Sequence, residues 1–301
     1  MTKIEAVKVE KAFAKNNGKK SNGDHNGETL ALGGVDLAIK KGEFHVILGP
    51  SGCGKSTFLD LIAGLSRPTG GQILIDGKPI EGPGLDRAVV FQQYALLPWR
   101  TARGNVEFGL ESQKIEKGER TKKANNFLSL VGLSGFEDHY PHELSGGMKQ
   151  RVSIARALAL NPDILLMDEP FGALDAQTRE ILQRDLLLIA SSTGKTIVFI
   201  THSIDEAVFL ADRVAVMTAR PGVIKSVVEV PLTREERLRD DVKVSDAFVK
   251  TRHQLWELLK EEVTKSSENC NRCTVDACTY GQKPVAAIQN PVVGDLHEYG
   301  S

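Results

Sequence analysis

The chain has 301 residues, of which 41% are hydrophobic and 26% charged, as expected of a soluble globular protein with one large or two small domains. Its formal net charge of −1 provides no basic field that would attract nucleic acid, so we expect no nucleic-acid partner. Because no apolar run approaches the roughly 18–20 residues that span a bilayer, and residues 1–5 lack the apolar core of a secretory signal, we expect a cytoplasmic protein.

Short β-rich runs alternate with helical stretches along most of the chain, a pattern typical of βαβ units and a mainly parallel sheet. The clearest predicted strands are Phe44–Leu48, Ala88–Phe91, Ile164–Met167, Thr196–Ile200 and Arg213–Met217. The predicted helices are Ser56–Ala63, Ser145–Leu160, Ala176–Ala190 and Ile204–Leu210. Because Leu97–Tyr140 has few β-branched runs, we interpret residues 95–160 approximately as a helical subdomain inserted into the sheet pattern.

Three stretches are predicted to lie outside this core. Lys15–Glu28 is polar and rich in glycine and asparagine, so we expect a mobile loop there. Val242–Val263 has helical spacing. Its expected inward positions are Val244, Phe248, Leu255, Leu258 and Leu259. We therefore expect an α/β domain over 1–230, a helical extension over 231–265 and a flexible, cysteine-containing tail over 266–301.

The segment Gly49–Ser56 fits the G-x-x-x-x-G-K-[ST] pattern of a phosphate loop. An apolar strand precedes it and a helix follows, so backbone N–H groups and a helix N-terminus would converge on phosphate. Lys55 would supply positive charge to the β- and γ-phosphates, and the Ser56 hydroxyl would ligate Mg²⁺. A chance match in a glycine-rich turn is the alternative. The expected nucleotide-binding residues of this segment are Gly49, Pro50, Ser51, Gly52, Cys53, Gly54, Lys55, Ser56 and Thr57.

Two further apolar strands end in polar side chains. Ile164–Met167 is followed by Asp168 and Glu169, and Ile197–Ile200 leads to His202. Because the carboxyl ends of parallel strands meet at one edge of a sheet, we expect these side chains beside the phosphate loop. Asp168 would hold Mg²⁺, Glu169 would polarise the attacking water as general base, and His202 would reach the γ-phosphate. The alternatives are a polar strand end or helix cap for the carboxylates and a structural histidine.

A second string, Leu144–Gln150 with the sequence LSGGMKQ, resembles the family motif of ATP-binding-cassette (ABC) ATPases. The resemblance covers about residues 4–230 and implies an α/β fold: a P-loop NTPase (RecA-like) core with a mainly parallel sheet, an antiparallel β edge and an inserted α-helical subdomain. It also implies ATP hydrolysis with ATP and Mg²⁺ bound. In this family Ser145, Gly146 and Gly147 close on the nucleotide of the opposite subunit. A homodimer or a pair of ABC subunits is therefore expected.

The same resemblance assigns four residues outside these two strings. Gln92 resembles the glutamine that senses Mg²⁺ and water while it contacts the membrane partner. Asp175 lies in a segment that resembles the loop crossing the dimer interface, and His202 resembles the histidine of the γ-phosphate. Phe13 is the expected aromatic that stacks on adenine, with an ordinary core aromatic as the alternative.

A narrower resemblance, to importers of nitrate, sulfonate, taurine and bicarbonate, rests on the segments Gly82–Gln92, Leu96–Arg100 and Ala219–Gly222. Because Tyr94, Leu97 and Trp99 follow Gln92, we expect them to line a groove for a cytoplasmic helix of a permease. Packing within the helical subdomain is the alternative for Trp99. The leading hypothesis is the energy-coupling ATPase of a small-anion importer, peripheral on the inner face of the cell membrane. Its expected partners are transmembrane permease subunits and, indirectly, an extracytoplasmic solute-binding protein.

The cysteines Cys270, Cys273 and Cys278 depart from anything this resemblance requires. Three thiolates at this spacing could bind zinc or an iron–sulfur cluster, with His253, His297 or a partner as a further ligand. A reduced tail without metal and redox control are the alternatives.

Two other functions compete with the importer hypothesis. One is a soluble ABC ATPase, such as an iron–sulfur assembly factor; the sequence contains neither the long coiled-coil insertion expected of repair ATPases nor the tandem cassettes expected of translation factors. The other is an ATP-gated dimerisation module without turnover, against which the intact Glu169 and His202 argue. A P-loop GTPase is disfavoured because the sequence has no Asn-Lys-x-Asp motif.

Overall fold

The computed structural model describes residues 1–14 and 28–271, with side chains described as far as residue 264. Apart from Glu28, the predicted loop Lys15–Glu28 lies outside the described residues, as do Cys273 and Cys278. Cys270 falls in the last helix, at a position whose side chain is not described. The predictions made for these cysteines therefore stay predictions.

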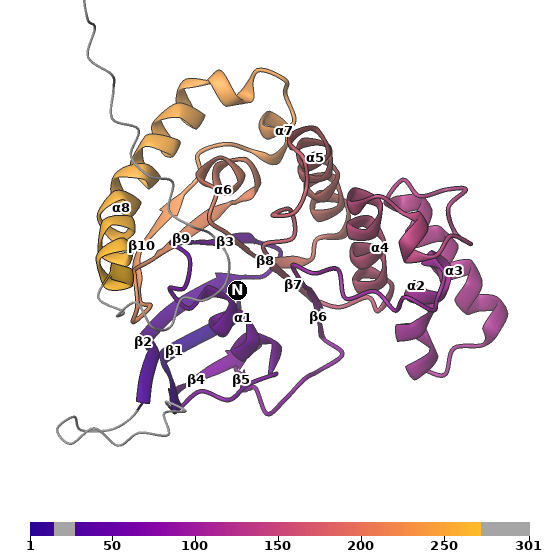
Figure 1. The fold of residues 1–301 in the computed structure, drawn as a ribbon, viewed down its shortest axis with the longest axis horizontal. Helices are drawn as coiled ribbons and strands as arrows, with labels where there is room; N and C mark the ends of the chain where they lie inside the picture. The colour runs from indigo at the N-terminus through magenta and orange to yellow at the C-terminus, as the bar shows by residue number, and fades with distance from the viewer. Residues whose placement is uncertain (15–27, 272–301) are drawn as a thin grey trace, which may run out of the picture.

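Six strands form the central sheet, in the order β10-β9-β3-β8-β7-β6 (Figure 1). Their bounds are β3 Phe44–Leu48, β6 Arg87–Val90, β7 Ile164–Asp168, β8 Thr196–Thr201, β9 Arg213–Met217 and β10 Ile224–Glu229. The first five of these pair in parallel, and β10 pairs antiparallel with β9 at one edge. The strands β3, β7 and β8 are buried almost throughout, as an apolar strand covered on both faces should be. All five predicted strands are confirmed.

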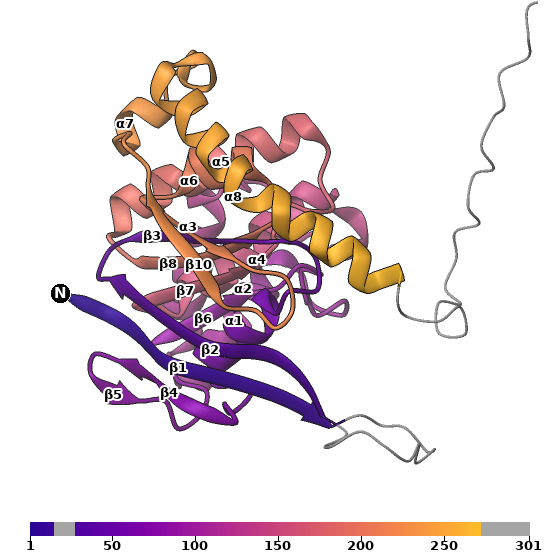
Figure 2. The same ribbon diagram turned by 90° about the vertical axis from the view of Figure 1, so that its left-hand side faces the viewer.

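A second, antiparallel sheet of four strands has the order β2-β1-β4-β5. Its bounds are β1 Thr2–Ala14, β2 Glu28–Lys40, β4 Gly70–Ile75 and β5 Lys78–Pro79. Figure 2 shows these strands gathered on one side of the central sheet. Together with the helix α1, Lys55–Ala63, they form one of the two apolar cores. The expected antiparallel edge is thus present twice, as β10 and as this sheet.

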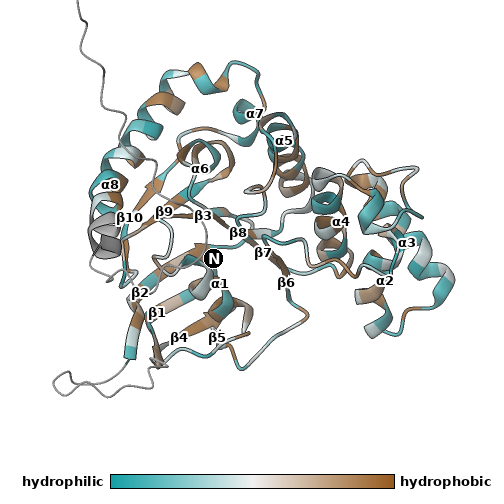
Figure 3. Ribbon diagram, viewed as in Figure 1, coloured by the Kyte–Doolittle hydropathy of each residue, from teal (hydrophilic) through white to brown (hydrophobic). Residues whose placement is uncertain are grey.

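Helices cover the opposite face of the central sheet. They are α4 Gly146–Ala159, α5 Ala176–Thr193, α6 Ile204–Leu210 and α8 Asp246–Asn271. Within β3, Val46 and Leu48 belong to the core under these helices, whereas Ile47 belongs to the core under α1. This alternation follows from the two-residue period of a strand, which sends successive side chains to opposite faces. Figure 3 shows the resulting hydropathy, with brown residues along the central strands and teal residues on much of α3 and α8.

The region after β6 is helical and lies at one end of the molecule, on the right in Figure 1. It contains α2 Ala102–Ser112, α3 Lys117–Leu130, the 3₁₀ turn η1 Pro141–Glu143 and α4. The helix α2 begins at Thr101, whose hydroxyl accepts a hydrogen bond from the Gly104 N–H at 3.1 Å. Fully buried Asn105 ties α2 to the preceding segment through the main chain of Leu97.

The end of the described chain comprises α7 Arg234–Arg237, the 3₁₀ turn η2 Val242–Val244 and α8. Phe248, Leu255 and Leu259 are buried as predicted and Leu258 is partly buried, but Val244 is 78% exposed, so the prediction of an inward Val244 is wrong. Val244 precedes helix α8, which begins only after Ser245. The helix α8 runs as far as Asn271. Over the two ranges that the structure describes, no helix is both long and apolar enough to cross a bilayer.

Candidate active site

The phosphate loop joins β3 to α1, and its glycines are required by close contacts. Gly54 has a φ of 107°, and a Cβ there would lie 2.9 Å from Leu32 Cδ2 and 3.0 Å from the Ala31 carbonyl oxygen. A Cβ on Gly49 would lie 3.1 Å from the Met217 carbonyl oxygen. The strands β2 and β9 therefore press the loop into its path, and α1 starts directly after it. This geometry fits a cradle of backbone N–H groups for phosphate.

Cys53 belongs to the same loop but faces inward. Its side chain is 1% exposed, and burial raises the pKa of its thiol. A buried, protonated thiol is a packing residue rather than a nucleophile. The predicted contribution of Cys53 to nucleotide binding is thus left to its main chain.

The ammonium of Lys55 is held inside the loop itself. Lys55 is 4% exposed, and its Nζ donates to the carbonyl oxygens of Gly49 and Pro50, both at 2.9 Å. A carboxylate oxygen of Glu169 lies 3.7 Å from the same nitrogen. A buried ammonium needs such acceptors. Phosphate oxygens would be stronger, charge-assisted partners for it.

Ser56 and Asp168 meet where the start of α1 faces the end of β7. The Ser56 hydroxyl donates to Asp168 Oδ1 at 3.0 Å. Burial raises the pKa of Asp168, and the charge of Glu169 acts in the same direction, while the Ser56 hydrogen bond lowers it. Hydroxyl and carboxylate oxygens are the hard ligands that suit Mg²⁺, which keeps waters and substrate phosphates as its other ligands. The pair therefore fits a magnesium site completed by nucleotide rather than a protein cage. In keeping with this, no cluster of three or more possible ligand side chains occurs among the described residues.

Glu169 and His202 are in direct contact at the same edge of the sheet. Glu169 Oε2 lies 2.9 Å from His202 Nδ1, and Glu169 is 20% exposed against 58% for His202. The backbone of Glu169 has a φ of 42°, a left-handed conformation that costs energy in a residue other than glycine. Its N–H donates to the carbonyl oxygen of Ile200 in β8 at 3.1 Å, which fixes that conformation. The arrangement pairs a carboxylate base with an imidazole beside the ammonium of Lys55.

A buried acid that sequence reasoning missed supports the histidine. Glu206, 8% exposed, accepts hydrogen bonds from the Thr201 hydroxyl at 2.5 Å and from Gln183 Nε2 at 3.2 Å. Burial raises the pKa of Glu206, and these hydrogen bonds oppose that rise. The Thr201 hydroxyl in turn accepts from the Ser203 N–H at 3.0 Å, so both neighbours of His202 are fixed. The sequence signal that could have revealed Glu206 is an acidic residue in the first turn of the short, apolar helix α6.

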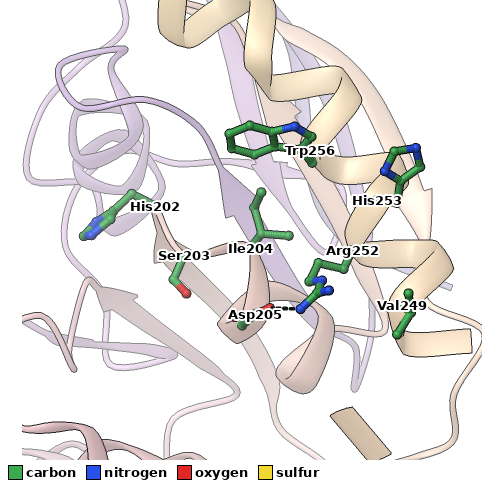
Figure 4. Close-up of a pocket in the computed structure, with 8 residues that line it drawn as sticks. All are labelled: His202, Ser203, Ile204, Asp205, Val249, Arg252, His253 and Trp256. Carbon is green, nitrogen blue, oxygen red and sulfur yellow. Dashed lines mark ion pairs between the residues drawn. The ribbon is translucent and has the colours of Figure 1, made fainter. Parts of the chain in front are cut away.

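A cavity of about 550 Å³ opens beside His202, between α6 and α8 (Figure 4). Its wall on α8 carries Trp256 and Arg252, and Arg252 lies 3.9 Å from Asp205 on α6. This contact places the C-terminal helix next to the segment that carries the histidine.

Three predicted residues lie on the surface around this cluster. Gln92 follows β6 and faces the segment after Glu169, since a Cβ on Gly172 would lie 3.6 Å from its Nε2. Asp175 caps α5 by accepting a hydrogen bond from the Thr178 N–H at 3.0 Å, and this bond lowers the pKa of Asp175. Phe13 ends β1 and is 47% exposed, so it is not a core aromatic.

The segment of Ser145, Gly146 and Gly147 is not brought to the phosphate loop of its own chain. Ser145 caps α4, its hydroxyl accepting from the Met148 N–H at 3.3 Å, and a Cβ on Gly146 would lie 3.2 Å from the Tyr94 hydroxyl. The helix α4 packs on the face of the sheet opposite to α1.

Near its other end, α4 is tied to the segment that follows Gln92. Arg156 donates to the carbonyl oxygens of Tyr94 and Ala95, at 3.0 and 2.6 Å. Tyr94 and Ala95 have φ values of 22° and 47°, which are unusual for residues other than glycine. The segment is therefore held in an unusual backbone path by α4.

Comparison with known proteins identifies the family. A family model described as ABC transporter matches residues 32–172. Over 244 residues the chain is 55% identical to an uncharacterized ABC transporter ATP-binding protein of Methanocaldococcus jannaschii, covering 81% of this chain and 90% of that protein. The chain belongs to the ABC transporter family. It is an ATP-binding, ATP-hydrolysing subunit of that family, as predicted.

Further ABC relatives narrow the group. The chain is 47% identical over 246 residues to the nitrate import ATP-binding protein of Synechocystis sp., with coverages of 80% and 92%. It is 46% identical over 247 residues to the taurine import ATP-binding protein of Pelagibacter ubique, with coverages of 79% and 93%. The predicted resemblance to the nitrate, sulfonate and taurine importer group is thereby confirmed.

A solved ABC structure supports the fold. It is a dimeric, post-hydrolysis state of an ATP-binding cassette bound to ADP and phosphate, with a TM-score of 0.65 and 35% identity, covering 76% of this chain and all of that one. The predicted P-loop NTPase fold is confirmed. The roles of the individual site residues stay predictions.

Proposed function

We propose that this chain is the energy-coupling ATPase of an importer for a small anion of the nitrate, sulfonate–taurine or bicarbonate type. The contact between Glu169 and His202 beside Lys55, in a chain similar to nitrate and taurine import ATP-binding proteins, carries the proposal. The subunit would act as a dimer on permease subunits at the inner face of the cell membrane. An extracytoplasmic solute-binding protein would deliver the anion.

We assign the binding roles as follows. The N–H groups of residues 49–57 and the Nζ of Lys55 bind the phosphates, exchanging the two carbonyl bonds of Lys55 for charge-assisted ones. Ser56 and Asp168 would hold Mg²⁺, with Gln92 as a further ligand or sensor. When bound, Mg²⁺ neutralises charge that develops on the β- and γ-phosphates. Phe13, exposed at the end of β1, stacks on adenine.

Glu169 is the proposed general base. It takes a proton from the water that attacks the γ-phosphorus, and its new O–H then donates to Nδ1 of His202, 2.9 Å away. A ring protonated at Nε2 can at the same time donate a hydrogen bond from that N–H to the γ-phosphate. Because Thr201 and Ser203 fix the histidine on both sides, the pair is oriented before substrate binds.

The second half of each site would come from a partner subunit. Within one chain, Gly146 lies against Tyr94, at the start of the helix that covers the face opposite to α1. A second copy can present this helix start to the nucleotide of the first, with Asp175 at the shared interface. Hydrolysis then replaces one bridging triphosphate by separate products, so the interface opens and moves the permease. The related dimeric cassette with ADP and phosphate supports this arrangement.

The proposed architecture keeps the division expected from the sequence. Residues 1–230 form the ATPase domain, about 95–160 its helical subdomain, and 231–265 a C-terminal helical extension. Trp99, 71% exposed in the segment after Gln92, is available to a permease helix.

A Glu169→Gln variant tests the catalytic assignment. Loss of the base should lower the steady-state ATPase rate roughly 10²–10⁴-fold, while ATP-dependent dimers persist in sedimentation experiments. Glu229→Gln, an exposed carboxamide substitution on β10, is the matched control. Equal hydrolysis by Glu169→Gln and wild type would refute the assigned base. Copurification of the chain with a permease, and anion uptake by that complex, tests the importer assignment.

A further inference from the structure

The turn between β9 and β10 packs directly on the phosphate loop. Arg220 Nη2 donates to the carbonyl oxygen of Gly52 at 3.1 Å. Gly222 sits so close that a Cβ there would overlap the carbonyl oxygen of Cys53. The N–H of Gly222 also donates to the Ala31 carbonyl oxygen at 2.9 Å, which anchors the turn to β2. The turn therefore contacts two consecutive peptide units of the loop.

These two contacts control where the loop points its N–H groups. A trans peptide is planar, so its C=O and N–H point in opposite directions. Holding the Gly52 carbonyl from one side fixes the direction of the Cys53 N–H, and blocking the Cys53 carbonyl fixes that of the Gly54 N–H. Donors held in place in this way bind phosphate without a further cost of reorganisation.

The turn is itself held by the C-terminal helix α8. Glu262, 2% exposed, accepts a hydrogen bond from the Ala219 N–H at 3.1 Å through Oε2 and one from Lys225 Nζ at 3.0 Å through Oε1. These two partners flank the turn on both sides. Inside the turn, the Thr218 hydroxyl donates to the Pro221 carbonyl oxygen and accepts from the Val223 N–H, both at 3.1 Å. A chain of hydrogen bonds thus connects α8 to the phosphate loop.

We propose that Glu262 is a positioning residue for ATP binding, acting from α8 through Ala219 and Arg220 on the phosphate loop. The inference rests on the proposed role of that loop. A buried carboxylate is costly unless it is hydrogen-bonded, and Glu262 accepts hydrogen bonds from the two residues that flank the turn. The helix α8 thereby reaches the nucleotide site without touching nucleotide.

Steady-state ATPase kinetics of the full chain test this role, with circular dichroism to confirm folding. Glu262→Ala should raise the KM for ATP about 10-fold, the effect of losing roughly one charge-assisted hydrogen bond, with kcat within about threefold of wild type. A merely destabilised protein would show the opposite, a lower apparent kcat at unchanged KM. Glu262→Gln, which keeps an acceptor for Ala219, should restore most of the affinity.

The neighbouring acid provides a matched control. Glu261 also contacts Lys225, at 3.1 Å, but is 62% exposed. Glu261→Ala should leave the KM for ATP unchanged. Arg220→Ala should raise the KM for ATP as Glu262→Ala does. The KM of the double variant should not exceed the higher of the two single-variant values, because both residues act through one turn.

The outcomes separate this inference from the proposed function. If Lys55→Ala still binds ATP as wild type does, the role of the phosphate loop fails and the inference fails with it. Suppose that Lys55→Ala no longer binds ATP. The inference alone is then overturned if Glu262→Ala keeps the wild-type KM, or if Glu261→Ala raises the KM as much as Glu262→Ala does. Should Glu262→Ala fail to fold, Arg220→Ala decides: a wild-type KM overturns the inference and a raised KM supports it.

Discussion

Replacing Gly222 by alanine adds one methyl group where the β9–β10 turn meets the phosphate loop. The new Cβ would overlap the Cys53 carbonyl oxygen and lie 3.1 Å from Met217 Sδ. The methionine side chain can rotate away, but the carbonyl belongs to the loop backbone. Turn and loop must therefore separate by on the order of 1 Å. Overpacking of this kind costs roughly 1–3 kcal/mol of folding free energy.

The functional effect should exceed the loss of stability. A displacement of about 1 Å near reacting groups can cost up to 10²-fold in rate, so we expect the kcat/KM for ATP to fall roughly 10- to 100-fold. ATPase assays and urea unfolding of the same preparations measure the two effects. Gly82→Ala is the control, because a Cβ there meets no heavy atom within 4 Å. A Gly222→Ala variant with wild-type kcat/KM would show that the loop does not depend on this turn.

Three further substitutions test other parts of the structure. Burial alone would raise the pKa of Glu43, but hydrogen bonds from His45 and Arg213 lower it to about 2. Wild type should therefore exceed Glu43→Gln in unfolding free energy by about 3 kcal/mol at pH 7, and the gap should close as pH falls from 4.5 to 2; a gap independent of pH contradicts this. Arg237→Met removes the ion pair between Arg237, 2% exposed, and Asp212, 31% exposed. Because Asp212 keeps its ion pair with Arg234 while the carbonyl oxygens of Leu210 and Leu232 lose a donor, the variant should cost roughly 1–3 kcal/mol in urea unfolding. Trp99→Ala should leave the ATPase rate of the isolated subunit within about twofold but weaken copurification with a permease; a large loss of stability would instead indicate a packing role.

The arrangement of the candidate site was predictable because its residues lie at or shortly after the ends of apolar strands. Lys55 follows β3 in the phosphate loop, Asp168 ends β7, and His202 comes directly after β8; parallel pairing carries such positions to one edge. Their local sequence therefore contains the information that places them. The contact between Glu169 and His202 follows from the same geometry.

Other features depend on contacts that no local pattern records. The hydrogen bond between Glu262 and the Ala219 N–H joins segments far apart in the chain. The strands β1 and β2 pair with several register shifts, which break the two-residue alternation that would have revealed them. Val244 continued a helical spacing, but Ser245 starts the helix by accepting from the Phe248 N–H at 3.4 Å.

The hydrogen bonds of Arg156 connect α4 to the segment that follows Gln92. A guanidinium that donates to two carbonyl oxygens resists separation from them, so this segment and α4 should move together. Along the helix axis, Arg156 lies roughly 15 Å from Gly146, at 1.5 Å per residue. In the proposed dimer, Gly146 contacts the nucleotide of the partner subunit. A shift of the segment after Gln92 would then reach the partner's site through α4, so each subunit would influence its partner's turnover.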